Sequence, residues 1–361
     1  MKIRELPSFL ICILWGAMNN LDATAQLQPL VADSFLNFMQ SNKNRASIFI
    51  SANDTTIAQL NEDKLMPLAS TMKIMVAVEF AMQASAKMLD KDSYVSLREL
   101  EKYYLPDTDG GAHPAWLDYE HAENNIKKDS VQLIEVARGM TMFNSNANTE
   151  FLMDLLGFDN VKNNHQLFEL RNHTAIFPVV SSLFIYQNPG KLRENKLLSA
   201  ISNLSEEEYC KYAFAIHNKL KNNVDYKSGF RPQDLSPKMQ KLWSDRSTAS
   251  TTKEYVHLVK ILNNRKFLDE NTYGIIAEVL EFPMESKTFQ DEFRWYGGQG
   301  GSTSFVLTHV IYFTNKNGEK MELAIFFNDL TAREEKQLER WLYPFEGQVI
   351  FDSQFREKLK F

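Results

Sequence analysis

Hydrophobic and polar positions alternate between helical and strand-like spacing in the first quarter of the chain. Residues 30–39 carry apolar side chains at helical intervals. Residues 46–51 and 55–60 are short runs rich in strand formers, and an Ala-Asn-Asp turn separates them, which predicts an antiparallel hairpin. A second apolar helix then follows from residue 70 to about residue 88. The expected order here is helix, hairpin, helix.

The middle of the chain, from about residue 91 to 285, has mainly helical periodicity. Residues 131–142 and 149–156 are its clearest helical stretches. Residues 105–114 interrupt the pattern, because their proline and glycine content is typical of a loop. This part of the chain therefore predicts a helical lobe.

The end of the chain returns to strands. Residues 304–313 and 320–327 are rich in β-formers, a turn at 315–318 separates them, and residues 331–341 have helical spacing. Strands near both termini predict one antiparallel sheet with the helical middle inserted into it. We expect an α/β (α+β) fold in which residues 26–90 plus 286–361 form one lobe and residues 91–285 form a second, all-α lobe, with a cleft between the two.

The overall composition is that of an ordinary globular protein. The chain has 361 residues, of which 44% are hydrophobic and 24% charged, and its net charge is -6. Lysine and arginine are scattered along it. Without a basic stripe to neutralise phosphates, nucleic acid is not an expected partner.

The first 25 residues resemble an export signal. Lys2 and Arg4 precede a short apolar run at residues 9–15, and Ala23-Thr24-Ala25 fits the small-x-small cleavage pattern. We expect a signal peptide over residues 1–25 and a secreted or periplasmic mature protein without a stable membrane span; an uncleaved anchor is the alternative. Cys210 would then be the only cysteine, which excludes a disulfide within one chain.

The most informative stretch is Ser70-Thr71-Met72-Lys73, at the start of the apolar helix after the hairpin. A serine hydroxyl is a weak nucleophile that needs a base beside it. Residues three apart lie on one face of a helix, so the lysine amine can reach the hydroxyl. Burial against apolar neighbours lowers the preference of an amine for its charged form. Ser70 is therefore a candidate nucleophile and Lys73 its candidate base, which indicates acyl transfer.

The same spacing occurs a second time in the chain. Residues 250–253 read Ser-Thr-Thr-Lys, but there Thr251 and Glu254 form a capping box ahead of an apolar-periodic run. We interpret this second copy as a helix start. The pattern alone therefore does not identify a nucleophile, and Ser70 depends on its context.

With its position after a hairpin, the pair at Ser70 and Lys73 resembles the serine β-lactamase and penicillin-binding protein superfamily. That superfamily has three signatures, S-x-x-K, S-D-N and K-T-G. Their order and spacing here are similar to the class A β-lactamase branch over essentially the whole mature chain. The resemblance implies a β-lactamase/transpeptidase-like fold.

The second signature is expected on the helical lobe. Asn144, Ser145 and Asn146 lie at the S-D-N positions. The resemblance implies that Asn146 binds the substrate amide and that Asn144 replaces the serine that relays a proton to the leaving nitrogen. Because an amide does not titrate, adjacent Ser145 is the candidate relay. The alternative is a polar helix N-cap.

The third signature is expected on a strand. Gln299, Gly300, Gly301 and Ser302 resemble the K-G-G-S variant of K-T-G, with Gln299 in the place of the lysine that holds the substrate carboxylate in the family. The N–H groups of Ser302 and Ser70 are candidates for an oxyanion hole. A glycine-rich turn is the alternative, and a phosphate loop is disfavoured because these glycines lead into a strand.

A further departure from the family concerns deacylation. Class A enzymes use a loop glutamate to activate water, and the corresponding residues 175–184 contain no acid. Four histidines, His113 among them, lack metal-ligand spacing, and we interpret His113 as structural.

These observations lead to one function hypothesis and two alternatives. The hypothesis is a serine hydrolase acting through a Ser70 acyl-enzyme on a β-lactam or a related cell-wall peptide amide, with no metal or cofactor. The alternatives are a D,D-peptidase or penicillin-binding protein with slow deacylation, and a non-catalytic binding descendant of the fold.

Overall fold

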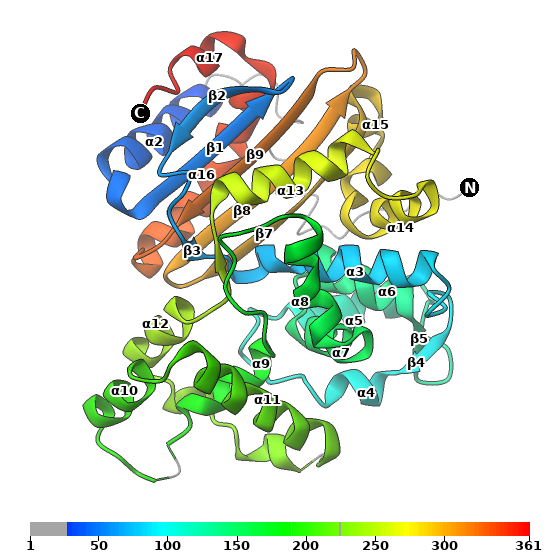
Figure 1. Ribbon diagram of the computed structural model, residues 1–361, viewed down its shortest axis with the longest axis vertical. Helices are drawn as coiled ribbons and strands as arrows, with labels where there is room; N and C mark the ends of the chain where they lie inside the picture. Colours follow the sequence, from blue (N-terminus) through cyan, green and yellow to red (C-terminus); the bar gives the residue numbers. More distant parts are fainter. Residues whose placement is uncertain (1–26, 189, 224) are drawn as a thin grey trace. The chain divides into compact units, whose positions relative to one another are not determined.

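The computed structural model describes residues 27–188, 190–223 and 225–361 (Figure 1). The predicted signal peptide, residues 1–25, lies outside the described residues. The chain forms two compact units. Of the described residues, unit 1 contains 27–71 together with Ser250–Phe267 and Glu281–Phe361, and unit 2 contains those within Met72–Ala249 and Leu268–Leu280.

Unit 1 is built on a five-stranded antiparallel sheet in the order β2-β1-β9-β8-β7. Two strands come from the N-terminal part of the chain and three from the C-terminal part, so the predicted sheet built from both ends is confirmed. The strands are β1 (Ala46–Ala52), β2 (Thr55–Leu60), β7 (Phe293–Thr303), β8 (Val306–Asn315) and β9 (Lys320–Phe327).

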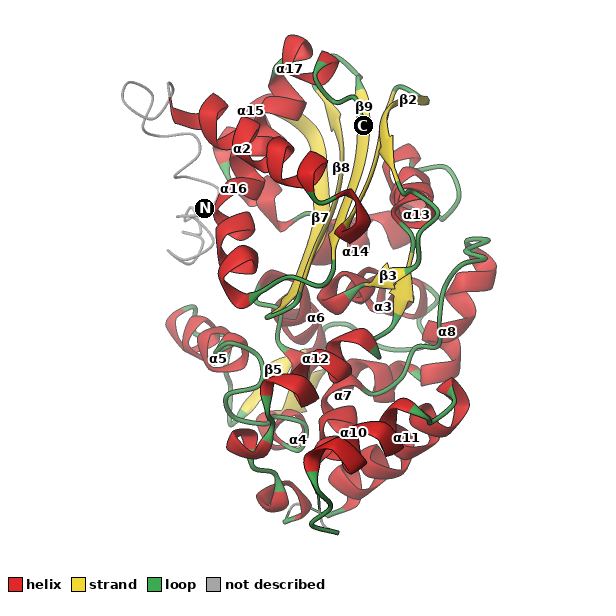
Figure 2. Cartoon of the chain, turned by 90° about the vertical axis from the view of Figure 1, so that its left-hand side faces the viewer, coloured by secondary structure: helices red, strands yellow, loops and turns green. Residues whose placement is uncertain are grey.

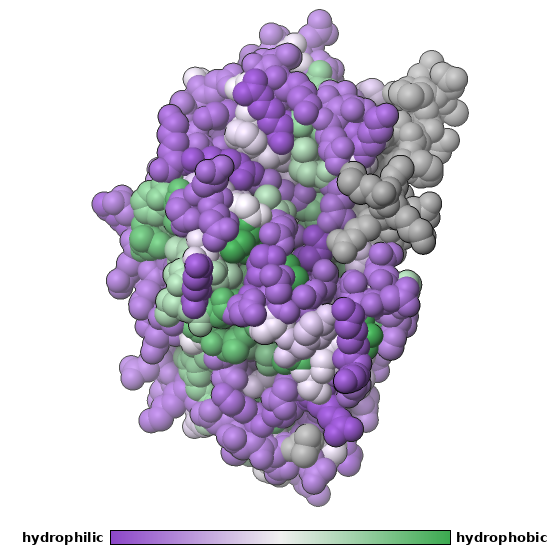
Figure 3. Space-filling model, turned by 90° about the vertical axis from the view of Figure 1, so that its right-hand side faces the viewer, coloured by the Kyte–Doolittle hydropathy of each residue, from purple (hydrophilic) through white to green (hydrophobic). Residues whose placement is uncertain are grey.

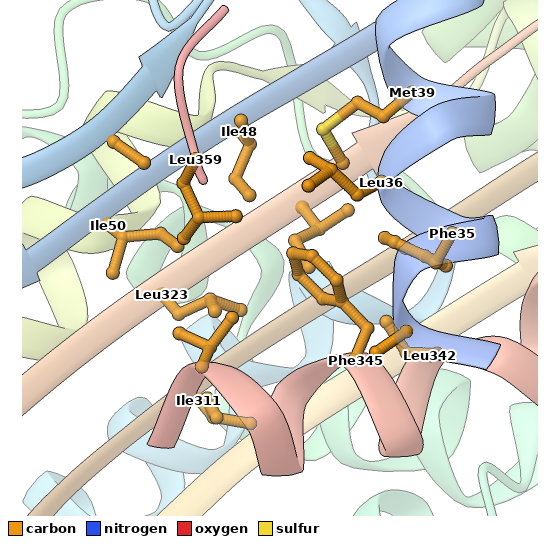
Figure 4. Packing of buried hydrophobic residues seen from close by; sticks show 14 of the residues in the cluster. Phe35, Leu36, Met39, Ile48, Ile50, Ile311, Leu323, Leu342, Phe345 and Leu359 are labelled. Atoms are coloured by element: carbon orange, nitrogen blue, oxygen red, sulfur yellow. The ribbon is translucent and has the colours of Figure 1, made fainter. Parts of the chain in front are cut away.

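Helices cover both faces of this sheet. Helices α2 (Leu27–Ser41) and α16 (Ala332–Phe351) pack on one face, and α13 (Thr252–Asn264) crosses the other (Figures 1 and 2). Figure 4 shows the apolar layer on the α2 and α16 side. Each such side chain contributes about 1.5–3 kcal/mol when fully buried. The labelled residues are Phe35, Leu36, Met39, Ile48, Ile50, Ile311, Leu323, Leu342, Phe345 and Leu359.

The remaining elements of unit 1 are short. They are β3 (Met66–Pro67), α15 (Lys287–Glu292), α17 (Ser353–Glu357) and the 3-10 helices η1 (Lys43–Arg45) and η6 (Phe282–Glu285). The chain passes from one unit to the other within η2 (Ala69–Met72), within β6 (Ala249–Ser250), after Phe267 and after Leu280.

Unit 2 is mainly helical, with α3 (Lys73–Ser85) at its centre. Ten of its thirteen residues are buried, and it packs against α6, α7, α8 and α14. The other helices are α4 (Leu97–Glu101), α5 (Ala112–Ala122), α6 (Leu133–Met142), α7 (Asn146–Leu156), α8 (Phe158–Leu167), α9 (Val179–Ser182), α10 (Glu194–Ser202), α11 (Glu206–Asn222), α12 (Pro237–Asp245), α14 (Glu270–Leu280), η3 (Leu183–Tyr186), η4 (Tyr226–Gly229) and η5 (Pro232–Asp234).

One small sheet departs from the expected all-α lobe. Strands β4 (Tyr94–Ser96) and β5 (Ser130–Gln132) pair antiparallel within unit 2. The lobe limits expected from the sequence stay a prediction. The two compact units divide the chain at different places, because α3 belongs with the helices and α13 belongs with the sheet.

The face of the protein drawn in Figure 3 is mostly polar. Hydrophilic side chains cover most of the face drawn in Figure 3, with apolar atoms showing between them, as on most folded proteins. None of the helices that the structure describes has the length and apolar character needed to cross a membrane.

Candidate active site

The candidate nucleophile lies in a tight turn. Ala69, just before Ser70, has φ +46, a left-handed conformation that is uncommon for a residue with a side chain. The N–H of Thr71 donates to the carbonyl of Leu68 at 3.0 Å, and η2 runs directly into α3. Ser70 is half-buried. The turn therefore presents Ser70 three residues before Lys73, the first residue of α3.

Strand β7 passes against the backbone of this turn. A Cβ added to Gly301 would collide with the amide nitrogen of Ser70 and lie 2.8 Å from that of Thr71. On the neighbouring strand, the hydroxyl of Thr308 lies 2.7 Å from that of Thr71 and donates to the carbonyl of Leu68 at 2.8 Å. The close approach explains the need for glycine at position 301. Two of the predicted motifs therefore meet in unit 1.

Lys73 is buried, with only 2% of its surface exposed. Its ammonium donates to the backbone carbonyl of Asn144 at 2.7 Å and to Oδ1 of Asn146 at 3.2 Å. Burial lowers the pKa of Lys73 to about 7, and the negative charge of Asp109 opposes this effect. A large fraction of the Lys73 side chains is therefore in the neutral amine form near pH 7, which is the form that accepts a proton.

The turn at residues 144–146 brings these acceptors to Lys73. Asn144 has φ +67, a conformation in which asparagine is enriched, and Asn146 begins α7. Between them, Ser145 is fully buried and caps the helix by accepting from the N–H of Asn148 at 3.2 Å. Nδ1 of His113 lies 2.9 Å from the Ser145 hydroxyl. Ser145 therefore has the contacts of an N-cap, and its predicted role as a proton relay stays a prediction.

The four residues of the third motif follow one another along β7, so their side-chain positions alternate between the two faces of the sheet. Gln299 is buried and its amide donates to the carbonyl of Gly300 at 2.9 Å. The hydroxyl of exposed Ser302 donates to Glu339 on α16 at 3.2 Å. The structure therefore places a strand where the resemblance requires one, and it gives Ser302 an acidic neighbour.

Sequence reasoning missed Glu150, a buried carboxylate on α7. It accepts from the backbone N–H of Ser181 at 3.0 Å and from the hydroxyl of Ser181, and Nδ1 of His217 lies 2.9 Å away. Burial lowers the pKa of His217, but hydrogen bonds to Asp154 and Glu150 outweigh it and raise that pKa to about 9. The sequence feature that could have indicated Glu150 is its position one helical turn after Asn146, on the same face of the helix. Through these hydrogen bonds, the Glu150 carboxylate connects segment 175–184, which contains no acid, to helix α7, which begins at Asn146.

Comparison with known proteins identifies the family of this chain. The model of the beta-lactamase enzyme family matches residues 29–340. The chain belongs to that family. No curated protein matches the sequence. The matched range includes Ser70, Lys73 and both stretches that were predicted to carry the second and third motifs.

Solved structures show the same fold at low sequence identity. A class A beta-lactamase from Bacteroides cellulosilyticus is 12% identical, with a TM-score of 0.53, and the match covers 90% of this chain and 99% of that one. A beta-lactamase from Chitinophaga pinensis is 14% identical, with a TM-score of 0.53 and coverage of 88% and 99%. The structure described as PBP-A is 13% identical, with a TM-score of 0.52 and coverage of 89% and 95%. The predicted family and fold class are therefore confirmed.

Proposed function

We propose that this family member is a serine hydrolase that forms an acyl-enzyme at Ser70 with β-lactams or related cell-wall peptide amides. One observation carries the proposal: Lys73 is a buried amine with a pKa of about 7, and it directly follows the turn that holds Ser70. This combination supplies a base for a hydroxyl that is otherwise a weak nucleophile.

In the first step, Ser70 Oγ attacks the carbonyl carbon of the amide and its proton passes to Nζ of Lys73. The carbonyl oxygen becomes an oxyanion, for which the N–H groups of Ser70 and Ser302 are the proposed donors. The approach of Gly301 to the Ser70 backbone supports this pairing. Asn146 is the proposed partner of the substrate amide, and Gln299 and Gly300 complete the strand along which the substrate would lie.

In the second step, the C–N bond breaks and the leaving nitrogen takes a proton. Asn144 carries an amide, which does not supply one, and the Ser145 hydroxyl is engaged with His113 and the N-cap. We therefore assign this proton to the Lys73 ammonium formed in the first step. The lysine then returns to its starting state and the acyl group stays on Ser70 as an ester. With a β-lactam the opened ring remains attached.

Slow deacylation is favoured by a separate observation. Segment 175–184 contains no aspartate or glutamate, and Ser181 within it is hydrogen-bonded to Glu150. Glu150 in turn contacts His217, so its carboxylate is already engaged by two groups. A family member without a base for the hydrolytic water would hold its acyl group for a long time, as a penicillin-binding protein does.

Intact-mass measurement of the purified protein after addition of penicillin tests the proposal. We expect a mass increase equal to one penicillin, which persists if deacylation is slow and disappears if hydrolysis is efficient. Either time course supports an acyl-enzyme. Cooperative unfolding of the same sample shows that the protein is folded. If the folded protein gains no mass, the proposed activity is contradicted and a non-catalytic binding protein is favoured.

A further inference from the structure

His113, which the sequence presents as a structural residue of a loop, lies directly behind the turn that holds Lys73. It is the second residue of α5 and is buried, with 1% of its surface exposed. The ring of Tyr104 lies 4.8 Å and that of Trp116 5.3 Å from the imidazole, measured between ring centroids. The aromatic neighbours fix the plane of the ring, so its two nitrogens point in defined directions.

Those two nitrogens join a surface carboxylate to a buried hydroxyl. Nε2 lies 3.6 Å from Glu101, and Nδ1 lies 2.9 Å from the hydroxyl of Ser145. A carboxylate only accepts, so the ring proton belongs on Nε2 and Nδ1 accepts from Ser145. The Ser145 oxygen still accepts from the N–H of Asn148. With the ring proton on Nε2, the imidazole faces Glu101 with its N–H and accepts from Ser145 at Nδ1.

Glu101 is itself held in place. The ammonium of Lys227 lies 3.5 Å from its carboxylate and also donates to its backbone carbonyl. The pKa of Glu101 is lowered, first by its interaction with His113 and also by the charge of Lys227. Glu101 is therefore ionised at neutral pH, which maintains the tautomer of His113.

Ser145 stands between the two acceptors of the Lys73 ammonium. The carbonyl of Asn144 precedes it and the side chain of Asn146 follows it. A displacement of Ser145 moves both acceptors together. Catalytic groups that are misplaced by about 1 Å lose on the order of a hundredfold in rate.

We propose that His113 is a positioning residue, which holds the turn at residues 144–146 through Ser145 and so keeps Lys73 in the geometry that serves Ser70. This inference rests on the proposed function for its catalytic consequence. The contact between His113 and Ser145 stands independently of it.

Three variants test the proposal. In His113→Asn, the amide oxygen is placed near the position of Nδ1 and accepts from Ser145. His113→Phe fills a similar space without a polar atom. His121→Asn is the matched control, because His121 is an exposed histidine on the same helix.

The first readout is the rate of acylation by penicillin, measured at several concentrations. We expect the limiting rate of His113→Phe to fall roughly 10- to 100-fold while the half-saturating concentration stays unchanged. His113→Asn should stay within about threefold of the wild type, and His121→Asn should match it. Equal rates in wild type and His113→Phe would overturn the proposal. So would equal losses in His113→Phe and His113→Asn.

The second readout does not need catalysis. Amide hydrogen exchange of residues 143–149, followed by mass spectrometry, should be faster in His113→Phe and unchanged in His113→Asn. If the wild type forms no adduct, the proposed function fails and exchange alone decides about His113. In that case, exchange that is faster in His113→Phe but not in His113→Asn supports the positioning role. Exchange in His113→Phe that equals that of the wild type refutes it.

Discussion

The two copies of the Ser-x-x-Lys pattern in this protein lie in different environments. Lys73 follows Ser70 by three positions and is buried, with its ammonium bound to Asn144 and Asn146. Lys253 follows Ser250 by the same spacing, but its side chain is 54% exposed and its ammonium pairs with Asp63 at 3.1 Å in solvent.

The difference comes from the helices that the two copies begin. Helix α3 is buried on almost every side, so Lys73, its first residue, is removed from water. Helix α13 has one polar face, and Thr251 serves as its N-cap by accepting from the N–H of Glu254. Burial of the lysine, and not the spacing of serine and lysine, therefore distinguishes a candidate catalytic pair from a helix start.

The largest expected effect is at the two serines. Ser70→Ala should lower covalent labelling by penicillin at least about a thousandfold, because it removes the attacking oxygen. Ser250→Ala should label as the wild type does. Labelled penicillin followed by gel and mass measurement checks both. Labelling that persists in Ser70→Ala would show that the nucleophile lies elsewhere.

The lysines should differ next. Lys73→Met should slow acylation about 10²- to 10⁴-fold, the usual contribution of a general base. Lys253→Met is the matched control and should acylate at the wild-type rate, since the Lys253 amine is solvated. Single-turnover rates at pH 7 decide the comparison. Similar losses in the two variants would mean that burial does not separate them.

The acylation rate should also depend on pH through Lys73. Its pKa is about 7, and only the neutral amine accepts the serine proton. Below this pH the rate should fall by up to about tenfold per pH unit, and above it the rate should level off. The pH profile of Lys253→Met should superimpose on that of the wild type. A wild-type midpoint near 10 would exclude a base with a lowered pKa.

The smallest effect is expected at the second copy. Thr251→Ala should lower the free energy of unfolding by about 1 kcal/mol, because it leaves an N-terminal N–H of α13 without its cap. Urea unfolding measures this loss. The acylation rate of Thr251→Ala should equal that of the wild type. A lower acylation rate would indicate that residues 250–253 contribute to catalysis.

Much of the fold could be predicted from local sequence patterns. Strand β9, Lys320–Phe327, has the predicted limits, and the hairpin of β1 and β2 turns at Asn53 and Asp54, which both have positive φ. Helix α16 extends ten residues beyond the expected end at Trp341, because tertiary packing carries it past Pro344. Local preference gave the element types, and packing decided this boundary.

The candidate site was less predictable, because its contacts join residues far apart in the chain. The spacing of Ser70 and Lys73 indicated a candidate nucleophile and base, and the family resemblance added Asn146 as a candidate. Neither revealed that His113 reaches Ser145 or that Glu150 holds Ser181. The two residues of each of these buried polar pairs lie about thirty positions apart in the chain. Hydrophobic periodicity does not indicate contacts between residues that far apart.

The buried amine of Lys73 also makes the stability of the folded state depend on pH, with the lower stability on the acid side. In the unfolded chain this amine has a pKa near 10.5, and in the folded protein near 7. Between these values unfolding takes up a proton, so the Lys73 contribution to stability becomes more favourable as pH rises, by up to about 1.4 kcal/mol per pH unit. Below pH 7 the folded state carries the full penalty of a buried charge. Burial of Lys73 thus costs stability at a position where function and stability oppose each other.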